Sequence, residues 1–112
     1  MKLIRAIIRP SKLDDVIDAL SGVGVQGMTV IAVHGFGRQK GHKTVYRGQE
    51  YVAHLIEKKM IEIIARDEDT ERIAKTVVET ARTGEVGDGK IFISSVDNAI
   101  RIRTGEEGDK VV

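Results

Sequence analysis

The sequence predicts an α+β domain of the ferredoxin-like class, with the order βαββαβ and a four-stranded antiparallel sheet backed by two helices. Three observations favour this class. Short segments rich in isoleucine and valine alternate with segments in which apolar residues recur at helical spacing. A long, glycine-containing loop separates the second predicted strand from the third. The 112 residues include 41% apolar residues, enough for one core, so we expect a single domain spanning residues 1–112.

The first half of the chain contains two predicted strands and one predicted helix. Lys2 to Arg9 is rich in isoleucine and is stopped by Pro10, which disfavours helix at the residue before it. In the helix that follows, Ser11 can act as the cap, and the glycines at positions 22 and 24 end the helix. Met28 to Val33 is apolar and β-branched, so we expect a buried strand that leads into the long loop.

The second half is predicted to contain the other two strands and the second helix. Leu55 to Ala65 is predicted as a strand with alternate residues on opposite faces. The helix is expected from about Asp69 to Arg82, with Val78 among the residues that face the core. Ile91 to Val96 is predicted as the last central strand, and Ile100 to Arg103 as a short edge piece.

The composition of the chain indicates its cellular compartment and the kinds of partner that it can bind. The absence of cysteine excludes disulfides and thiolate metal sites, and no apolar run reaches the length of a membrane span, so we expect a cytoplasmic protein. A net charge of +1 with 31% charged residues argues against a dedicated nucleic-acid binder. The strands carry apolar residues on both faces while the helices cover only one, and oligomerisation is the simplest explanation.

The segment from Gly35 to Tyr51 is glycine-punctuated and strongly basic, and it lies between two apolar runs. Its glycines are predicted to disfavour both a stable helix and a central strand in this segment. Ordering it would cost ~1–2 kcal/mol per residue in backbone entropy, with little apolar surface to bury in return. Long loops of this kind are functional or disordered, and we expect this one to be poorly ordered without a ligand or a target.

A second glycine-rich segment runs from Thr83 to Lys90 and leads from a helix into a strand. Closely spaced glycines let backbone amides approach a phosphate, and Lys90 would add a positive charge. The alternative is a helix cap followed by a turn. Arg101 and Arg103 alternate across Ile102, so we expect both guanidinium groups on one face, where they suit a polyphosphate. The alternative is that the two arginines are charged residues of an exposed edge strand and bind no ligand.

Glu62 is the carboxylate of greatest interest. A charge among isoleucines on a central strand is costly unless it is paired or binds a ligand, and an intersubunit ion pair is the alternative to a ligand. His34, His42 and His54 lack the spacing of metal ligands. No serine or threonine has a recognisable arrangement of histidine and carboxylate around it, so the residues do not support a hydrolase with a nucleophilic side chain.

Four segments together resemble the PII signal-transduction proteins, the trimeric regulators of nitrogen metabolism. They are IIRPSKLDDV, GFGRQKGHKTVYRGQEY, TGEVGDGKIFI and RIRTGEE, in the family's order and at its intervals. The resemblance covers essentially the whole chain. It implies a ferredoxin-like homotrimer with a flexible T-loop at about residues 36–54, a phosphate-binding B-loop at about 82–90 and a C-terminal loop at about 101–112.

The resemblance implies that ATP or ADP lies in each cleft between neighbouring subunits. Glu62 would then recognise the base rather than act as an acid. The B-loop would cradle the phosphates, and Arg101 and Arg103 would reach them from the adjoining chain. The residues that the resemblance assigns to ATP or ADP are Ile7, Thr29, Gly37, Arg38, Gln39, Glu62, Ile64, Gly87, Asp88, Gly89, Lys90, Arg101 and Arg103.

The resemblance also implies a site for 2-oxoglutarate and magnesium beside the nucleotide. Gln39 would coordinate Mg²⁺ between the ATP phosphates and 2-oxoglutarate, and Lys58 would bind the far carboxylate. A hard cation takes oxygen ligands, which phosphates and an oxo-acid supply. Because Gln39 belongs to the loop, ligand would change the loop's preferred conformations. The residues assigned to 2-oxoglutarate are Arg9, Gln39, Lys40, Gly41 and Lys58.

The tip of the loop carries two further family positions. Tyr51 matches the tyrosine that is uridylylated in many bacterial members, and Arg47 matches the arginine that enters the pore of ammonium transporters. The alternatives are an unmodified tyrosine and a solvated arginine.

The resemblance as a whole leads us to expect a non-enzymatic sensor without catalytic residues. Its target would be an ammonium transporter, its only link to a membrane, or a nitrogen-assimilation enzyme such as glutamine synthetase. The competing class is a weak ATP- or acyl-phosphate-hydrolysing enzyme of the same fold.

Overall fold

Six elements form the body of the molecule in the predicted order. The structure, a computed structural model, describes residues 1–36, 43–46, 49–52 and 55–112. The six elements are β1 (Lys2–Ile8), α1 (Leu13–Gly22), β2 (Thr29–Phe36), β5 (Leu55–Ala65), α2 (Asp67–Ala81) and β6 (Gly89–Ser95). This is the βαββαβ order that the periodicity predicts.

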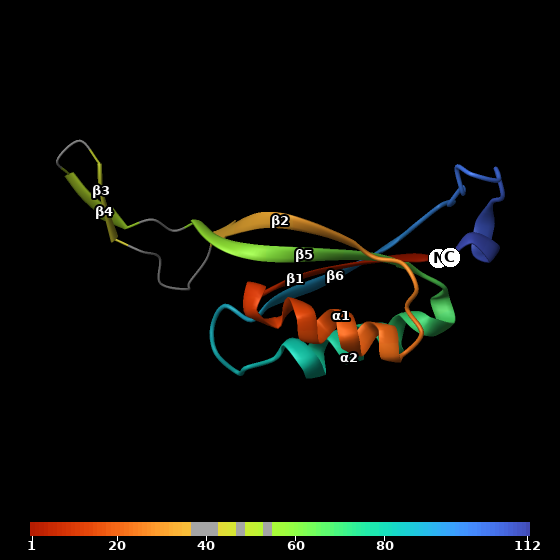
Figure 1. The fold of residues 1–112 in the computed structure, drawn as a ribbon, viewed down its shortest axis with the longest axis horizontal. Coiled ribbons are helices and arrows are strands. Elements are labelled where there is room, and N and C mark those ends of the chain that lie inside the picture. The colour runs from red at the N-terminus through yellow and green to blue at the C-terminus, as the bar shows by residue number, and fades with distance from the viewer. Residues whose placement is uncertain (37–42, 47–48, 53–54) are drawn as a thin grey trace.

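The four strands form one antiparallel sheet in the order β2-β5-β1-β6. Both helices lie on the same face of this sheet, as Figure 1 shows, and the opposite face, called the open face below, has no helix against it. The predicted ferredoxin-like α+β class is therefore confirmed. The apolar residues expected on both faces are also present, because Ile64 and Phe92 on the open face are 39% and 53% exposed.

The core lies between the sheet and the helices. Alternate residues of β1 and β5 point toward the helices, so that Ile4 is paired with Ile63 and is fully buried. Val78 of α2 is 39% exposed, so its predicted place in the core is wrong. It follows the buried Val77 by one residue, and one residue turns a helix by about 100°, away from the sheet. The buried residues are Ile4, Ala6, Ile8, Val16, Leu20, Ile61, Ile63, Ala65, Ile73, Val77 and Ala81.

Two local predictions at the ends of elements are wrong. Ser11 does not cap α1, because a 3-10 turn, η1 (Pro10–Lys12), precedes the helix, and neither start has a side-chain cap. Gly35 was expected in the loop, but β2 continues through it to Phe36, paired with Ile56 and Leu55 of β5. Pairing uses backbone groups, which glycine retains, so the pairing partner outweighs the weak strand preference of glycine.

The long loop contains a hairpin of its own. β3 (Lys43–Tyr46) and β4 (Gln49–Val52) pair antiparallel, with Tyr46 opposite Gln49. This hairpin is a two-stranded sheet separate from the main sheet, so it does not contradict the prediction that the glycines disfavour a helix or a central strand. Its residues include β-favouring threonine, valine and tyrosine. Figure 1 shows the hairpin beyond the end of β2 and β5.

The C-terminal segment is a turn rather than an edge strand. Only an isolated bridge between Ile100 and Glu107 is formed there, and the amide of Gly105 donates to the carbonyl oxygen of Arg101 at 2.7 Å. Gly105 has a φ of 72°, which reverses the chain where a strand would have continued. A short 3-10 helix, η2 (Gly108–Val111), follows.

The N-terminus is fixed to the second helix. The amino group of Met1 forms an ion pair with the carboxylate of Asp67, in the first turn of α2, at 2.9 Å. The carbonyl oxygen of Met1 accepts a hydrogen bond from the amide of Val96 at 3.1 Å. Among the described residues, no helix is long and apolar enough to cross a membrane.

Candidate functional site

The glycine loop, residues 82–90, leads from α2 into β6, and its three glycines, Gly84, Gly87 and Gly89, all have a positive φ. Gly87 and Gly89 have φ values of 105° and 102°, which other residues rarely adopt. A Cβ at Gly89 would also overlap the carbonyl oxygen of Ile7 in β1. The loop therefore lies directly against the first strand, and its backbone is accessible without side chains at these positions.

The Asp88 carboxylate holds the two ends of this loop together by accepting hydrogen bonds. Its carboxylate accepts hydrogen bonds from the amides of Thr83 and Gly84, both at 2.8 Å, and from the Thr83 hydroxyl. Nε of Arg9 donates to it at 3.0 Å. The Thr83 hydroxyl is the main cause that lowers the pKa of Asp88, with the two amides and Arg9 acting in the same direction. Asp88 was predicted among the nucleotide residues, and the structure gives its carboxylate a role in shaping the loop.

Two cations predicted for a different ligand also contact the glycine loop. Arg9 donates from Nη2 to the carbonyl oxygen of Val86 at 2.9 Å, and Nζ of Lys58 donates to that of Gly87 at 2.6 Å. Lys58 is only 7% exposed. Burial lowers the pKa of its ammonium, the Arg9 charge lowers it further, and Asp88 opposes both. The structure thus places Arg9 and Lys58, two of the residues predicted for 2-oxoglutarate, against the predicted phosphate loop.

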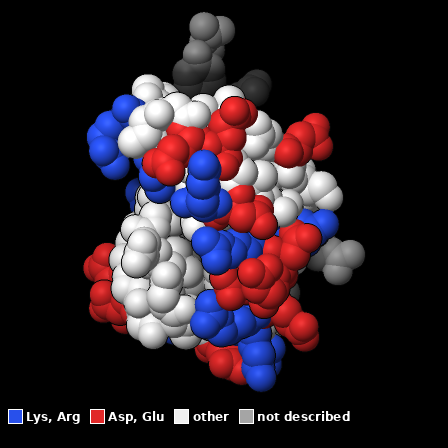
Figure 2. All heavy atoms as spheres, turned by 90° about the vertical axis from the view of Figure 1, so that its right-hand side faces the viewer, with Lys and Arg blue, Asp and Glu red and all other residues white. Residues whose placement is uncertain are grey.

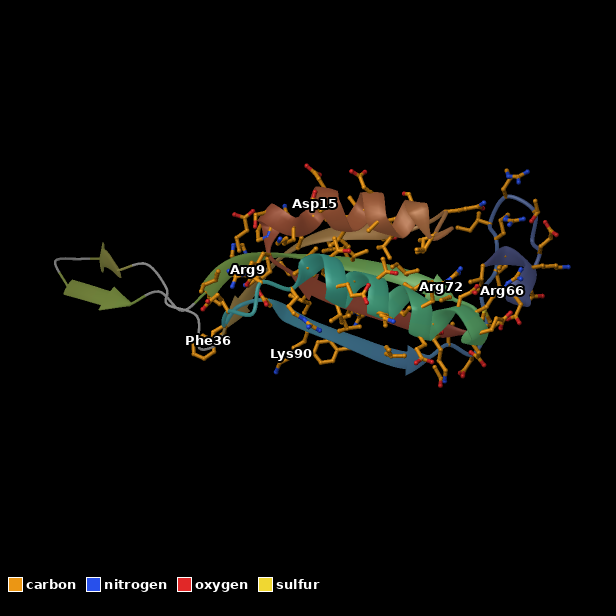
Figure 3. The ribbon with its side chains drawn as sticks, turned by 90° about the horizontal axis from the view of Figure 1, so that it is seen from below. Arg9, Asp15, Phe36, Arg66, Arg72 and Lys90 are labelled. Atoms are coloured by element: carbon orange, nitrogen blue, oxygen red, sulfur yellow. The ribbon has the colours of Figure 1, made fainter. Side chains whose placement is uncertain are left out.

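Lys58 and the glycine loop border a groove at the hairpin end of the sheet, which we call the loop-side groove. Its volume is ≈ 670 Å³. Figure 3 shows Arg9, Phe36 and Lys90 toward this end of the molecule. The groove is lined by Ile7, Gly35, Phe36, Ile56, Lys58, Phe92 and residues 85–90. Backbone amides and buried or exposed ammonium groups along it suit an anionic ligand.

Four more of the predicted nucleotide residues line a second groove, at the opposite end of the sheet, which we call the C-terminal groove. It has a volume of ≈ 910 Å³ and includes Thr29, Glu62, Ile64 and Arg101. Thr29 lies directly opposite Glu62 in the pairing of β2 with β5. Figure 2 shows basic and acidic side chains intermixed on this end of the molecule. The predicted nucleotide residues that line a groove are thus divided between two grooves of one chain.

Glu62 has an ion-pair partner within its own chain. Its Oε2 lies 3.3 Å from Nη2 of Arg5, which is opposite it on β1. The intersubunit pair considered as an alternative is therefore unnecessary to explain this carboxylate. Sequence reasoning missed Arg5, although its place at an alternating position of the first strand was the available signal.

The two C-terminal arginines are not arranged as predicted. Arg101 pairs with Glu106 at 3.0 Å, and Arg103 is exposed in the turn that replaces the expected edge strand. Strand alternation therefore does not align their guanidinium groups. Three further basic residues line the C-terminal groove and were not predicted for a site: Arg66, Arg72 and Lys110. Figure 3 shows Arg66 and Arg72 toward this end.

Several predicted residues lie outside the described part of the chain. They are Gly37, Arg38, Gln39, Lys40, Gly41 and Arg47. Tyr51 lies on β4, where the backbone is described and the side chain is not. Within the described residues, no three histidines or carboxylates form a cluster that could hold a metal ion. The magnesium role of Gln39 remains a prediction.

Comparison with known proteins gives consistent matches along the whole sequence. The family model for "Nitrogen regulatory protein P-II" matches residues 1–106. The chain is 53% identical over 112 residues to the nitrogen regulatory protein P-II of Pasteurella multocida (strain Pm70). It is 54% identical to nitrogen regulatory protein P-II 1 of Escherichia coli (strain K12) and 50% identical to the P-II protein of Haemophilus influenzae. Each match covers 100% of both chains, so the similarity includes both grooves and the long loop.

Proposed function

Because the chain belongs to the nitrogen regulatory protein P-II family, we propose that it is a nitrogen-regulatory sensor of ATP, ADP and 2-oxoglutarate. In this proposal the protein is a cytoplasmic homotrimer, and nucleotide binds in the clefts between its subunits. Loop residues 36–54 carry the signal to a target protein. The relatives are named as regulators, which favours regulation over catalysis.

The division of the predicted nucleotide residues between two grooves is the observation that carries the proposal. Ile7 and Lys90 line the loop-side groove, whereas Thr29, Glu62 and Arg101 line the C-terminal groove at the other end of the sheet. In this proposal the two grooves of one chain are halves of two different sites. A neighbouring subunit that brings its C-terminal groove against the loop-side groove would complete a site from two halves. The exposed Ile64 and Phe92 on the open face supply apolar surface for such an assembly.

The two half-sites suit different parts of a nucleotide. In the loop-side groove, backbone amides between Gly87 and Gly89 and the ammonium of Lys90 suit phosphate oxygens. In the C-terminal groove, the Glu62 carboxylate is an acceptor that suits the amino group of adenine, and Arg101 adds a charge for the phosphates. ATP or ADP therefore fits this combination of donors and acceptors.

Arg9 and Lys58 are suited to the carboxylates of 2-oxoglutarate. Both are cations held at the glycine loop, and Lys58 is nearly buried, which strengthens its attraction to an anion. Neither can bind a metal ion. The oxygen ligands of Mg²⁺ would come from ATP, from 2-oxoglutarate and from the side-chain amide of Gln39. Lys40 and Gly41 would complete the surroundings of the acid.

The loop would report ligand occupancy to the target. Gln39 and Lys40 are its proposed ligand contacts, and Arg47 and Tyr51 are its proposed partner and modification positions. We propose an ammonium transporter as the target, with a nitrogen-assimilation enzyme such as glutamine synthetase as the second candidate. Uridylylation of Tyr51 would add bulk and negative charge at this surface.

Calorimetry with the purified full-length protein tests the sensing step. We expect ATP to bind, and we expect 2-oxoglutarate to bind only when both ATP and Mg²⁺ are present. ADP should not support binding of the acid, because it lacks the third phosphate. If 2-oxoglutarate bound equally well with ADP, or not at all with Mg-ATP, the proposed sensing of this acid would be wrong.

A further inference from the structure

Four residues form one row across the open face of the sheet. Thr29 on β2 lies opposite Glu62 on β5, Glu62 lies opposite Arg5 on β1, and Arg5 lies opposite Phe92 on β6. Residues directly opposite each other in an antiparallel sheet point to the same face. Glu62 therefore has Thr29 on one side and Arg5 on the other.

The Arg5–Glu62 ion pair is the charged part of this row. Nη2 of Arg5 donates to Oε2 of Glu62 at 3.3 Å, and the two side chains are 44% and 25% exposed. The neighbouring rows on the open face are apolar along β1 and β5: Leu3 is opposite Ile64, and Ile7 is opposite Met60. A carboxylate between apolar rows loses solvation when the face is covered, and an adjacent guanidinium offsets this loss.

Arg5 approaches Glu62 from the side away from the C-terminal groove. Thr29, Glu62 and Ile64 line that groove, whereas Arg5 is not among its lining residues in the described part of the chain. A ligand in the groove would meet Glu62 and not Arg5. Any effect of Arg5 on this ligand would therefore act through the carboxylate.

We propose that Arg5 is a positioning residue for purine recognition. By holding Oε2, it fixes the Glu62 side chain so that Oε1 accepts a hydrogen bond from the 6-amino group of adenine. The inference rests on the proposed function, because it assumes that the base of ATP enters the C-terminal groove. It makes Arg5 a determinant of the preference for a 6-amino purine over a 6-oxo purine.

A comparison of ATP with inosine triphosphate isolates this effect, because inosine triphosphate carries a carbonyl oxygen in place of the 6-amino group. We expect Arg5→Gln to weaken ATP binding about fivefold to tenfold in calorimetry, within the usual range for coupled neighbouring groups. Binding of inosine triphosphate should change by less than about twofold, since it has no 6-amino group to donate to Oε1 of Glu62. Arg5→Lys should recover most of the ATP affinity, because it restores the charge.

Two further variants serve as controls. Lys2→Gln removes a charge from the same strand, but Lys2 contacts Ser95 at 3.1 Å rather than Glu62, so both nucleotides should bind as to the wild type. In a Glu62→Gln background, Arg5→Gln should have no further effect on ATP, because the contact through which Arg5 acts is already changed. Melting temperatures measured in parallel report whether each variant is folded.

The outcomes separate this inference from the proposed function. Equal weakening of both nucleotides by Arg5→Gln would show a general structural effect and overturn the positioning role. Unchanged or stronger ATP binding by the same variant would also overturn it, while the proposed function stood. Failure of the wild-type protein to bind ATP would overturn the proposed function and the inference together.

Discussion

Arg9 and Asp88 are 79 residues apart in sequence and are joined by a hydrogen-bonded ion pair of 3.0 Å. The pair fastens the residue after β1 to the loop before β6. Arg9 reaches Val86 of the same loop at 2.9 Å, and Lys58 reaches Gly87 at 2.6 Å. A ligand that attracts these cations would act directly on the conformation of the glycine loop.

The Asp88 carboxylate should make stability depend on pH in the acid range. Hydrogen bonds lower its pKa in the folded state, so its stabilising contribution is complete above the usual aspartate pKa of about 3.9 and is lost as pH falls toward the lowered value. We expect Asp88→Asn to melt below the wild type at pH 7. Thermal melts between pH 7 and pH 2.5 should show the difference shrinking below about pH 4. A difference that stayed constant down to pH 2.5 would contradict the role of the ionised carboxylate.

Gly89→Ala should be strongly destabilising. The new Cβ would overlap the carbonyl oxygen of Ile7, and the φ of 102° is unfavourable for alanine. We expect a loss of at least ~2 kcal/mol in the free energy of unfolding, measured by urea denaturation. Gly27→Ala is the matched control, because a Cβ there has no atom within 4 Å, and it should change stability by less than ~0.5 kcal/mol. Similar losses for both variants would contradict the close approach of the loop to β1.

Lys58→Gln should separate the binding of 2-oxoglutarate from the binding of ATP. Removing a nearly buried cation should weaken 2-oxoglutarate binding with Mg-ATP by ~10- to 100-fold, as expected for a hydrogen bond to a charged group. ATP alone should lose much less affinity, because the loop amides and Lys90 remain. Lys59→Gln is the control, since Lys59 pairs with Glu57 at 3.8 Å on the other face of the strand. Calorimetry in which both variants bound the acid normally would exclude Lys58 from its site.

Phe92→Asp should prevent the proposed assembly. Phe92 is 53% exposed on the open face, and a carboxylate there would be costly to bury against a second subunit. We expect light scattering to show trimers for the wild type and for Phe92→Leu, and monomers for Phe92→Asp. The monomeric variant should also lose ATP binding, because each half-site would lack its counterpart. A monomer that bound ATP with full affinity would refute a shared site.

Most of the fold could be predicted because the apolar periodicity of the sequence matches the buried positions. β5 has the predicted bounds, Leu55–Ala65, since its alternation is continuous. The errors occur where pairing with a distant strand or a positive φ overrides the local pattern. Gly35 is within β2 because β5 supplies its pairing partner. The segment after Ile100 turns because Gly105 adopts a positive φ, which periodicity does not reveal.

The resemblance could assign residues to the candidate site, but it could not give the contacts among them. The resemblance assigned Glu62 to the base and Asp88 to the nucleotide. It did not indicate that Arg5 contacts Glu62 or that Asp88 accepts hydrogen bonds from Thr83. These contacts depend on strand register and loop geometry, which bring together residues far apart in sequence. The same geometry divides the predicted residues that line a groove between two grooves.

The ion pair between the Met1 amino group and Asp67 has a practical consequence for work on this protein. An affinity tag or acyl group joined to the amine would remove its charge and add bulk at a side chain that is only 6% exposed. The Asp67 carboxylate, whose pKa is lowered mainly by its hydrogen bond to this amine, would lose its partner at the start of α2. A protein purified with a tag on its amino end would therefore differ in thermal stability from the untagged protein. A tag that is cleaved back to Met1 would leave the ion pair intact.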